Sequence, residues 1–332
     1  MERVGWFDMK EIPDALPPGP FTRTEAERAG VTPRMLRGRR FKRVFPRVWR
    51  LAAHVMTADD WVKAARLALP SDARLTGITL IQRLGLDVGP RFPLHFVIEG
   101  DLHIDLDEIF LHRTKKLAPH DGLCVTAAAA FLFYCSHARV IDAIQVGDWL
   151  LYWGHMRIGE VRALALSAVW RDGAHEALWI LDHLDPHSRS LKESETRAVL
   201  EFAGLPRPRV NAVLSLPPGE PAVIGDLLFD DWGLVVEYEG EHHQVERLRY
   251  SSDIDRYAVQ RRNAIPYLQV TRERLANPRK LALSVYRELV TLGFDGSPPV
   301  FGDRWASLFR PVREVVGSRD EWLKAYARGA VS

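Results

Sequence analysis

The sequence predicts a mixed α/β (α+β) chain that is divided into several domains. Its 332 residues suffice for two domains or slightly more. Near the N-terminus, two short helix patterns precede a basic hairpin pattern. Between about residues 190 and 295, helix and strand patterns follow the order αβββαβα, which is typical of a small mixed α/β domain.

The N-terminal patterns begin with residues that favour helix ends. Thr22 or Thr24 can cap a first helix, and Gly30 can end it in a left-handed conformation. Thr32 can cap a second helix, with proline at its first position. Residues 41–51 then alternate apolar and basic side chains around a proline, which predicts a short hairpin. Helix, turn, helix and basic hairpin outline a winged helix-turn-helix.

The middle and C-terminal patterns separate near residues 185–188. Before this point, helices are predicted over 58–70, 76–84, 125–134, 140–152, 159–170 and 174–184, and strands over 94–98 and 109–112. After it, helices are predicted over 191–203, 253–263 and 279–292, and strands over 210–216, 222–229, 234–239 and 267–270. The predicted organisation is a flexible lead-in (1–20), a winged helix-turn-helix (21–54), an α-rich connector with a small β element (55–185), the mixed α/β domain (190–295) and a C-terminal tail (296–332).

Charge is distributed unevenly, although the net charge is only +2. Nine Lys/Arg and no Asp/Glu lie between Arg28 and Arg50. Seven Asp/Glu and no Lys/Arg lie between Glu220 and Glu241. This distribution indicates that the basic segment binds a polyanion and that the acidic segment binds cations.

Several classes of protein are disfavoured by composition. Cys124 and Cys135 cannot supply a disulfide framework or a four-cysteine zinc site. The first 20 residues lack the apolar run of a signal peptide, and no apolar run reaches the roughly 18–20 residues that span a bilayer. We therefore expect a cytoplasmic protein with no membrane partner.

The acidic segment predicts a cluster of carboxylates on one sheet face. Glu237 and Glu239 point the same way because side chains alternate along a strand. If residues 230–233 form the hairpin turn, paired residue numbers sum to 463 and Asp226 lies opposite Glu237. Opposite Cβ atoms are about 5 Å apart, so three carboxylates would converge. A bulge at Gly233 would shift this register by one residue.

Clustered carboxylates repel one another unless a cation offsets their charge. Mg²⁺ prefers oxygen ligands and is commonly held by one or two carboxylates together with substrate phosphate. Such a metal polarises a phosphoryl oxygen and activates water. The alternative is that the acid cluster is a solvated hairpin edge. Asp230 and Asp231 are in either case expected to form the turn.

An ordered set of residues in this region resembles the very-short-patch-repair-like endonuclease domain, in particular the family called domain of unknown function 559. That family belongs to the restriction-endonuclease-like superfamily. The set is Ser194-Glu195, then Gly225 to Phe229, Val235 to Gly240, His243, and Asp255-Arg256-Tyr257. The resemblance covers about 105 residues of this chain, so it implies a restriction-endonuclease-like core over 190–295.

This resemblance also implies roles for individual residues. Asp226 and Glu237 would bind Mg²⁺ or Mn²⁺, Glu195 would support them, and His243 would lie near the scissile phosphate. Arg256 would be a phosphate-side or structural partner. Glu239 departs from the pattern because the superfamily keeps a lysine there and the family usually an aspartate, so the metal or His243 would have to activate water. Each of these residues also has a purely structural alternative. Glu195 can be a helix-cap acid, His243 a surface-loop residue, and Asp255 and Arg256 an ordinary helix ion pair.

Residues 21–51, with a weaker continuation to about 150, resemble the N-terminal antitoxin domain of the abortive-infection AbiEi family. The resemblance rests on Thr24-Glu25-Ala26, Gly30-Val31-Thr32, the arginine-rich helix and Val44 to Arg50. It implies a winged helix-turn-helix that binds DNA. The residues expected to contact DNA phosphates or groove edges are Arg34, Arg37, Arg39, Arg40, Lys42 and Arg43.

These patterns favour a DNA-binding protein with a metal-dependent endonuclease that hydrolyses DNA phosphodiester bonds, in DNA repair or in defence against phage and mobile elements. The alternative is a catalytically inactive regulator or antitoxin, which the missing lysine favours; an RNA target is a third alternative. DNA is the expected partner. A toxin or a second copy of the chain is a further candidate.

Overall fold

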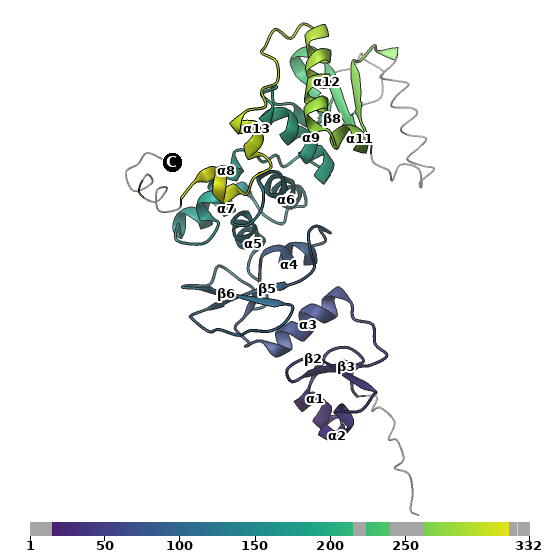
Figure 1. The fold of residues 1–332 in the computed structure, drawn as a ribbon, viewed down its shortest axis with the longest axis vertical. Helices are drawn as coiled ribbons and strands as arrows, with labels where there is room; N and C mark the ends of the chain where they lie inside the picture. The colour runs from purple at the N-terminus through teal and green to yellow at the C-terminus, as the bar shows by residue number, and fades with distance from the viewer. Residues whose placement is uncertain (1–14, 215–223, 240–261, 319–323, 325–332) are drawn as a thin grey trace, which may run out of the picture. The chain divides into compact units, whose positions relative to one another are not determined.

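The computed structural model describes residues 15–214, 224–239, 262–318 and 324. Their contacts divide the chain into unit 1, Met1–Thr126, and unit 2, Ala127–Ser332 (Figure 1). The division falls inside the predicted connector 55–185. The described residues form 13 α-helices and three small sheets, so the chain has the mixed α/β composition that the sequence predicts.

Unit 1 opens with two short helices, α1 (Arg23–Arg28) and α2 (Pro33–Leu36). The Thr22 hydroxyl accepts the Glu25 amide, and the Glu25 carboxylate accepts the Thr22 amide, which completes a capping box. The Thr32 hydroxyl caps α2 by accepting the Met35 amide at 3.3 Å. Capping at Thr22 and Thr32 is therefore confirmed.

A three-stranded antiparallel sheet follows, in the order β1 (Phe21–Thr22), β3 (Val48–Leu51), β2 (Phe41–Phe45). The predicted hairpin is confirmed, and Arg47 closes its turn with a φ of 63°. Phe21 and Phe41 meet edge to face at 6.1 Å and are buried with Leu36. Their burial fixes the two helices to the hairpin because apolar surface leaves water.

The rest of unit 1 comprises α3 (Ala58–Ala68), β4 (Arg74–Leu75), α4 (Gly77–Arg83), β5 (Leu94–Glu99) and β6 (Ile109–Thr114). Strand β5 pairs with β4 antiparallel and with β6 parallel. Trp61 of α3 lies edge to face with Phe45 of β2 and with Phe92, at 6.3 and 5.1 Å. These ring contacts connect α3 to the hairpin and to the segment before β5.

Unit 2 begins with five helices, α5 (Ala127–Cys135), α6 (Val140–Tyr152), α7 (Ile158–Ser167), α8 (Ala174–Leu181) and α9 (Leu191–Phe202). Gly173 precedes α8 with a φ of 86°, and a Cβ there would lie 1.8 Å from the Leu132 carbonyl oxygen. Only glycine fits this close approach of two backbone segments.

Residues 296–316, expected to begin a tail, pack within unit 2. They form α13 (Asp303–Ser307) and α14 (Val312–Val316), which contact α9 and α8 respectively. The Val140 amide donates to the Arg310 carbonyl, and the Val312 amide donates to the Ala138 carbonyl. Trp305 is buried, so this segment contributes to the core.

A four-stranded sheet completes unit 2, in the order β10 (Tyr267–Val270), β9 (Leu234–Tyr238), β8 (Ile224–Phe229), β7 (Arg209–Val213). Only β9 and β10 are parallel among these described strands. Helices α9 and α12 (Pro278–Thr291) both contact β9, and α11 (Arg272–Leu275) precedes α12. The predicted helix over 253–263 lies almost wholly outside the described residues. Among the helices that are described, none has the length and apolar character needed to cross a membrane.

Candidate active site and nucleic-acid interface

The β8–β9 register determines which acidic residues come together. Leu227 pairs with Val236 and Leu228 with Val235, so paired numbers sum to 463 and the predicted register is confirmed. The short 3-10 turn Asp230–Trp232 and left-handed Gly233 (φ 62°) close the hairpin without shifting it. Continuing the register by one residue places Asp226 opposite Glu237 on one face of the sheet.

Asp226 also takes part in the strand pairing through its side chain. Its Oδ2 accepts the Tyr238 backbone N–H at 2.9 Å, so the carboxylate lies against β9 one residue past Glu237. Asp226 is half-buried and Glu237 is 3 % exposed. Asp226 and Glu237 thus place two carboxylates at neighbouring register positions of adjacent strands, and these two residues are called the acidic centre below.

Glu239 lies at the end of the same strand, and its carboxylate is exposed. The Gln269 side-chain amide of β10 donates a hydrogen bond to the Glu239 carboxylate. Gln269 is the register partner of Glu237, so it stands beside the acidic centre. Beside the acidic centre, this strand therefore ends in a carboxylate held by a neutral amide.

Two glutamates of α9 face different neighbours. Glu195 accepts hydrogen bonds from Gln145 of α6 at 3.2 Å and from Lys192 at 2.6 Å, so it contacts α6 and its own helix. Glu193, which is 8 % exposed, accepts the Asn211 side-chain amide at 2.7 Å. Asn211 of β7 occupies the register position opposite Asp226. Glu193, and not Glu195, is thus the helix acid in contact with the sheet.

Sequence reasoning missed Glu193 and Asn211. Ser190 caps α9 and accepts the Glu193 amide at 3.1 Å, which makes Glu193 the third helical residue. The sequence is enough to predict an acidic residue at this capping position. It does not predict that the side chain contacts β7. Asn211 adopts a left-handed φ of 48°, which asparagine tolerates better than most residues. No periodic pattern predicts this kink within a strand.

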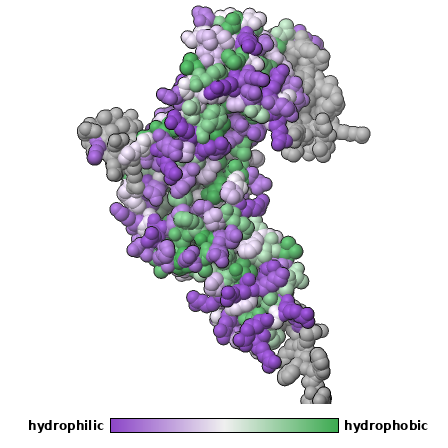
Figure 2. All heavy atoms as spheres, viewed as in Figure 1, coloured by the Kyte–Doolittle hydropathy of each residue, from purple (hydrophilic) through white to green (hydrophobic). Residues whose placement is uncertain are grey.

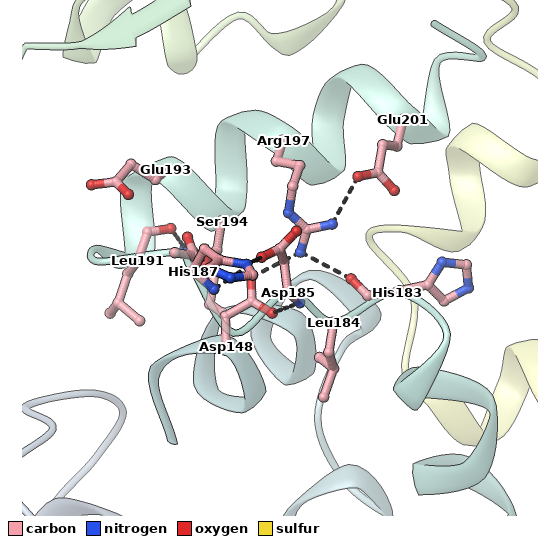
Figure 3. A network of polar contacts seen from close by, with 12 residues as sticks. Asp148, His183, Leu184, Asp185, His187, Leu191, Glu193, Ser194, Arg197 and Glu201 are labelled. Carbon is pink, nitrogen blue, oxygen red and sulfur yellow. Dashed lines mark hydrogen bonds and ion pairs between the residues drawn. The ribbon is translucent and has the colours of Figure 1, made fainter. Parts of the chain in front are cut away.

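A buried polar network holds α9 in place (Figure 3). Arg197 is fully buried; it donates at 2.8 Å to Asp148 of α6 and to Glu201, and at 2.9 Å to the His183 carbonyl. Asp148 also accepts the Asp185 amide at 2.7 Å. The network therefore joins α9, α6 and the segment between α8 and α9, and it fixes the helix that carries Glu193.

Burial raises the pKa of Asp148 to about 6, although the Arg197 guanidinium and the Asp185 amide act to lower it. Burial alone would lower the pKa of Arg197, but Asp148 and Glu201 raise it above its ordinary range. Both partners are therefore charged at neutral pH. The pair is structural because Arg197 and both of its carboxylate partners, Asp148 and Glu201, are buried.

The oxygen ligands at the acidic centre suit a hard divalent cation. Asp226 and Glu237 supply two carboxylates, a number that Mg²⁺ commonly uses when substrate phosphate and water complete its shell. Within the described ranges, no group of three or more His, Cys, Asp or Glu residues could hold a metal. His243 and Arg256, two expected site residues, lie outside those ranges.

The expected DNA-binding residues of unit 1 lie on its surface. Arg34, Arg37, Arg39, Lys42 and Arg43 are exposed, and Arg40 is half-buried. Hydrophilic residues cover the surface over α1 and α2 (Figure 2).

Arg50 belongs to the same basic block but has an internal role. Its Nη1 donates to the carbonyls of Leu51, Ala52 and His54, and so orders the chain after the hairpin.

In comparisons with protein-family models, with curated proteins and with solved structures, the chain matches none. The two resemblances therefore rest on the quoted residues alone.

Proposed function

We propose that the protein binds DNA through unit 1 and hydrolyses DNA phosphodiester bonds at the acidic centre of unit 2. The observation that carries this proposal is the register that sets Asp226 opposite Glu237. A helix acid, Glu193, contacts β7 beside these two strand acids, whereas the resemblance implied this role for Glu195, which contacts α6. The exposed arginines of the helix-turn-helix and hairpin supply the cationic surface that DNA requires.

In this mechanism Asp226 and Glu237 would hold Mg²⁺ or Mn²⁺, and the bound ion would supply Lewis-acid polarisation of the phosphoryl group and activation of a water. The Asp226 carboxylate is oriented by the Tyr238 amide at 2.9 Å. Glu193 and Asn211 fix β7 against α9 beside the same centre. Glu239 accepts a hydrogen bond from Gln269, so it can orient a water but cannot offer the positive charge of a lysine.

The second candidate is a DNA-binding regulator or antitoxin without catalytic activity. The Glu239–Gln269 contact favours it, because this pair occupies the position where a nuclease of the superfamily keeps a cation. Such a regulator would bind DNA equally well without divalent metal.

The test is cleavage of duplex, mismatched and single-stranded DNA by the full chain, with Mg²⁺, with Mn²⁺ and with a chelator. Asp226→Asn and Glu237→Gln each remove one ligand charge and keep the side-chain shape. Each should lower the cleavage rate by more than the roughly 10–100-fold that loss of an outer-shell partner costs. Asp231→Asn, at an exposed acid of the hairpin turn, is the matched control and should cleave like wild type.

Cleavage that persists in Asp226→Asn would contradict the proposed site. Absence of cleavage with either metal, together with metal-independent DNA binding, would establish the regulator instead.

A further inference from the structure

Two adjoining cavities lie along helix α3, and none of the residues expected to bind DNA lines either of them. Their volumes are about 600 and 500 Å³. Both linings include Asp59, Val62 and Arg83, so the cavities share one wall. Volumes of this size are typical of small-molecule sites.

The first cavity is basic. Lys63 and Arg66 line it together with Arg83 of α4, and Asp59 is its only acidic lining residue among those described. Asp59 already pairs with Arg83 at 3.0 Å. Neither Lys63 nor Arg66 has a carboxylate within salt-bridge distance in the described part of the chain. The cavity therefore offers two cations for an anionic group, above apolar walls that include Leu67 and Pro70.

The second cavity has an aromatic wall and a charged one. Trp61 and Phe92 line it with Met56 and Leu94, and its charged lining residues are Asp59, Arg83, Asp87 and Arg91. The Gln82 side-chain amide donates to the Val88 and Pro90 carbonyls, and this fixes the orientation of the side chain within the lining. Its side-chain carbonyl is thereby oriented as an acceptor. Aromatic walls and one fixed acceptor suit a flat heterocycle that carries N–H donors.

The spacing along α3 relates the two cavities. Trp61 and Arg66 are five residues apart, about 7.5 Å along a helix axis and about 140° around it, so they lie on different sides of α3. The two cavities meet at their shared lining residues Asp59, Val62 and Arg83. The wall between them is the exposed Arg83–Asp59 ion pair, and exposed pairs of this kind are weak. A ligand phosphate can therefore replace Asp59 as the partner of Arg83.

We propose that these cavities form one binding site for a nucleoside monophosphate. The base lies against Trp61 and Phe92, and the phosphate lies between Lys63, Arg66 and Arg83. A free phosphate would leave the aromatic cavity empty, and an apolar ligand would leave two cations without a partner. The combination of an aromatic wall and a cationic wall, joined through the shared lining residues Asp59, Val62 and Arg83, is what selects a nucleotide.

The test is isothermal titration calorimetry of the full chain with AMP, adenosine and inorganic phosphate as probes. A chelator in the buffer removes divalent metal, so the result is independent of the proposed nuclease centre. AMP should bind at least about ten-fold more tightly than adenosine or phosphate, because a charge-assisted hydrogen bond contributes on that scale. Lys63→Gln and Arg66→Gln should each weaken AMP binding about ten-fold and leave adenosine binding unchanged.

Lys115→Gln is the matched control, since Lys115 is exposed, belongs to unit 1 and lines neither cavity. Trp61→Leu should weaken both AMP and adenosine. If Trp61→Leu fails to fold because Trp61 packs on Phe45, the two surface variants still decide the question. The proposal is overturned if AMP shows no saturable binding at millimolar concentration, if adenosine binds as tightly as AMP, or if Lys115→Gln weakens AMP as much as Lys63→Gln. Weaker duplex-DNA binding by Arg66→Gln without any AMP binding would also overturn it, since these cations would then serve the DNA backbone.

Discussion

Replacing Arg197 by methionine tests whether the buried network holds α9 in its place. Methionine has a similar reach and fills much of the space, but it carries no charge and no N–H donor. Asp148 and Glu201 would lose their buried cation, and the His183 carbonyl would lose a donor. Asp148 would keep the Asp185 amide as a partner.

The expected loss is large because Arg197 and Asp148 are both 0 % exposed. Removing one partner of a buried ion pair typically costs about 3–5 kcal/mol, since the other charge stays buried without compensation. For a unit of this size, that loss corresponds to a fall in melting temperature of roughly 6–20 °C. The loss should be smaller at pH 5 than at pH 7, because Asp148 relieves the uncompensated charge by taking up a proton.

Urea unfolding of the wild type and of Arg197→Met, followed by far-ultraviolet circular dichroism, measures this difference. Arg139→Met is the control: Arg139 forms a bidentate ion pair with Asp142, but its side chain is 54 % exposed. That variant should lose no more than about 1 kcal/mol. If Arg197→Met also loses less than 1 kcal/mol, or if its loss does not depend on pH, the network does not hold α9 as argued.

Three further predictions concern single side chains. Folding raises the pKa of Asp148 from near 3.8 to about 6, so the native state binds the proton more tightly than the unfolded chain. As pH rises from about 4 to 6, the free energy of unfolding of the wild type should therefore fall by on the order of 3 kcal/mol relative to that of Asp148→Asn. Urea unfolding of both proteins across this pH range measures the difference, and parallel pH profiles would contradict the prediction. In unit 1, Arg43→Gln should weaken DNA binding and lower the salt dependence of the binding constant by about one unit of slope, without changing the melting temperature. Arg50→Gln should lower the melting temperature, because Arg50 bonds three backbone carbonyls; a normal melting curve for Arg50→Gln would refute that role.

The hairpin of unit 2 shows how far local sequence rules reach. Alternation of apolar residues and the turn residues around Gly233 were enough to predict the 463 register, and this register carries the Asp226–Glu237 pair. Such features follow from side-chain periodicity and turn chemistry, which act between residues close in the chain. The same holds for the helix caps at Thr22 and Thr32.

Contacts between distant segments were not predictable in this way. Glu193 and Glu195 lie two residues apart on the same helix. Only the packing of α9 in the fold shows that Glu195 contacts α6 and that Glu193 contacts β7. The contacting residues are distant in the sequence: Gln145 is 50 residues from Glu195, and Asn211 is 18 residues from Glu193.

The sequence by itself determined the mixed α/β composition, most helix and strand positions, the basic block and the acidic hairpin. Each of these depends on local propensity, periodicity or charge. The tertiary structure decided which helix acid contacts the sheet, that Arg50 and Arg197 serve the interior, and that residues 296–316 join the core of unit 2. These outcomes depend on which segments pack against one another when apolar surface is buried. The choice of packing partners is a property of the whole fold and not of any one segment.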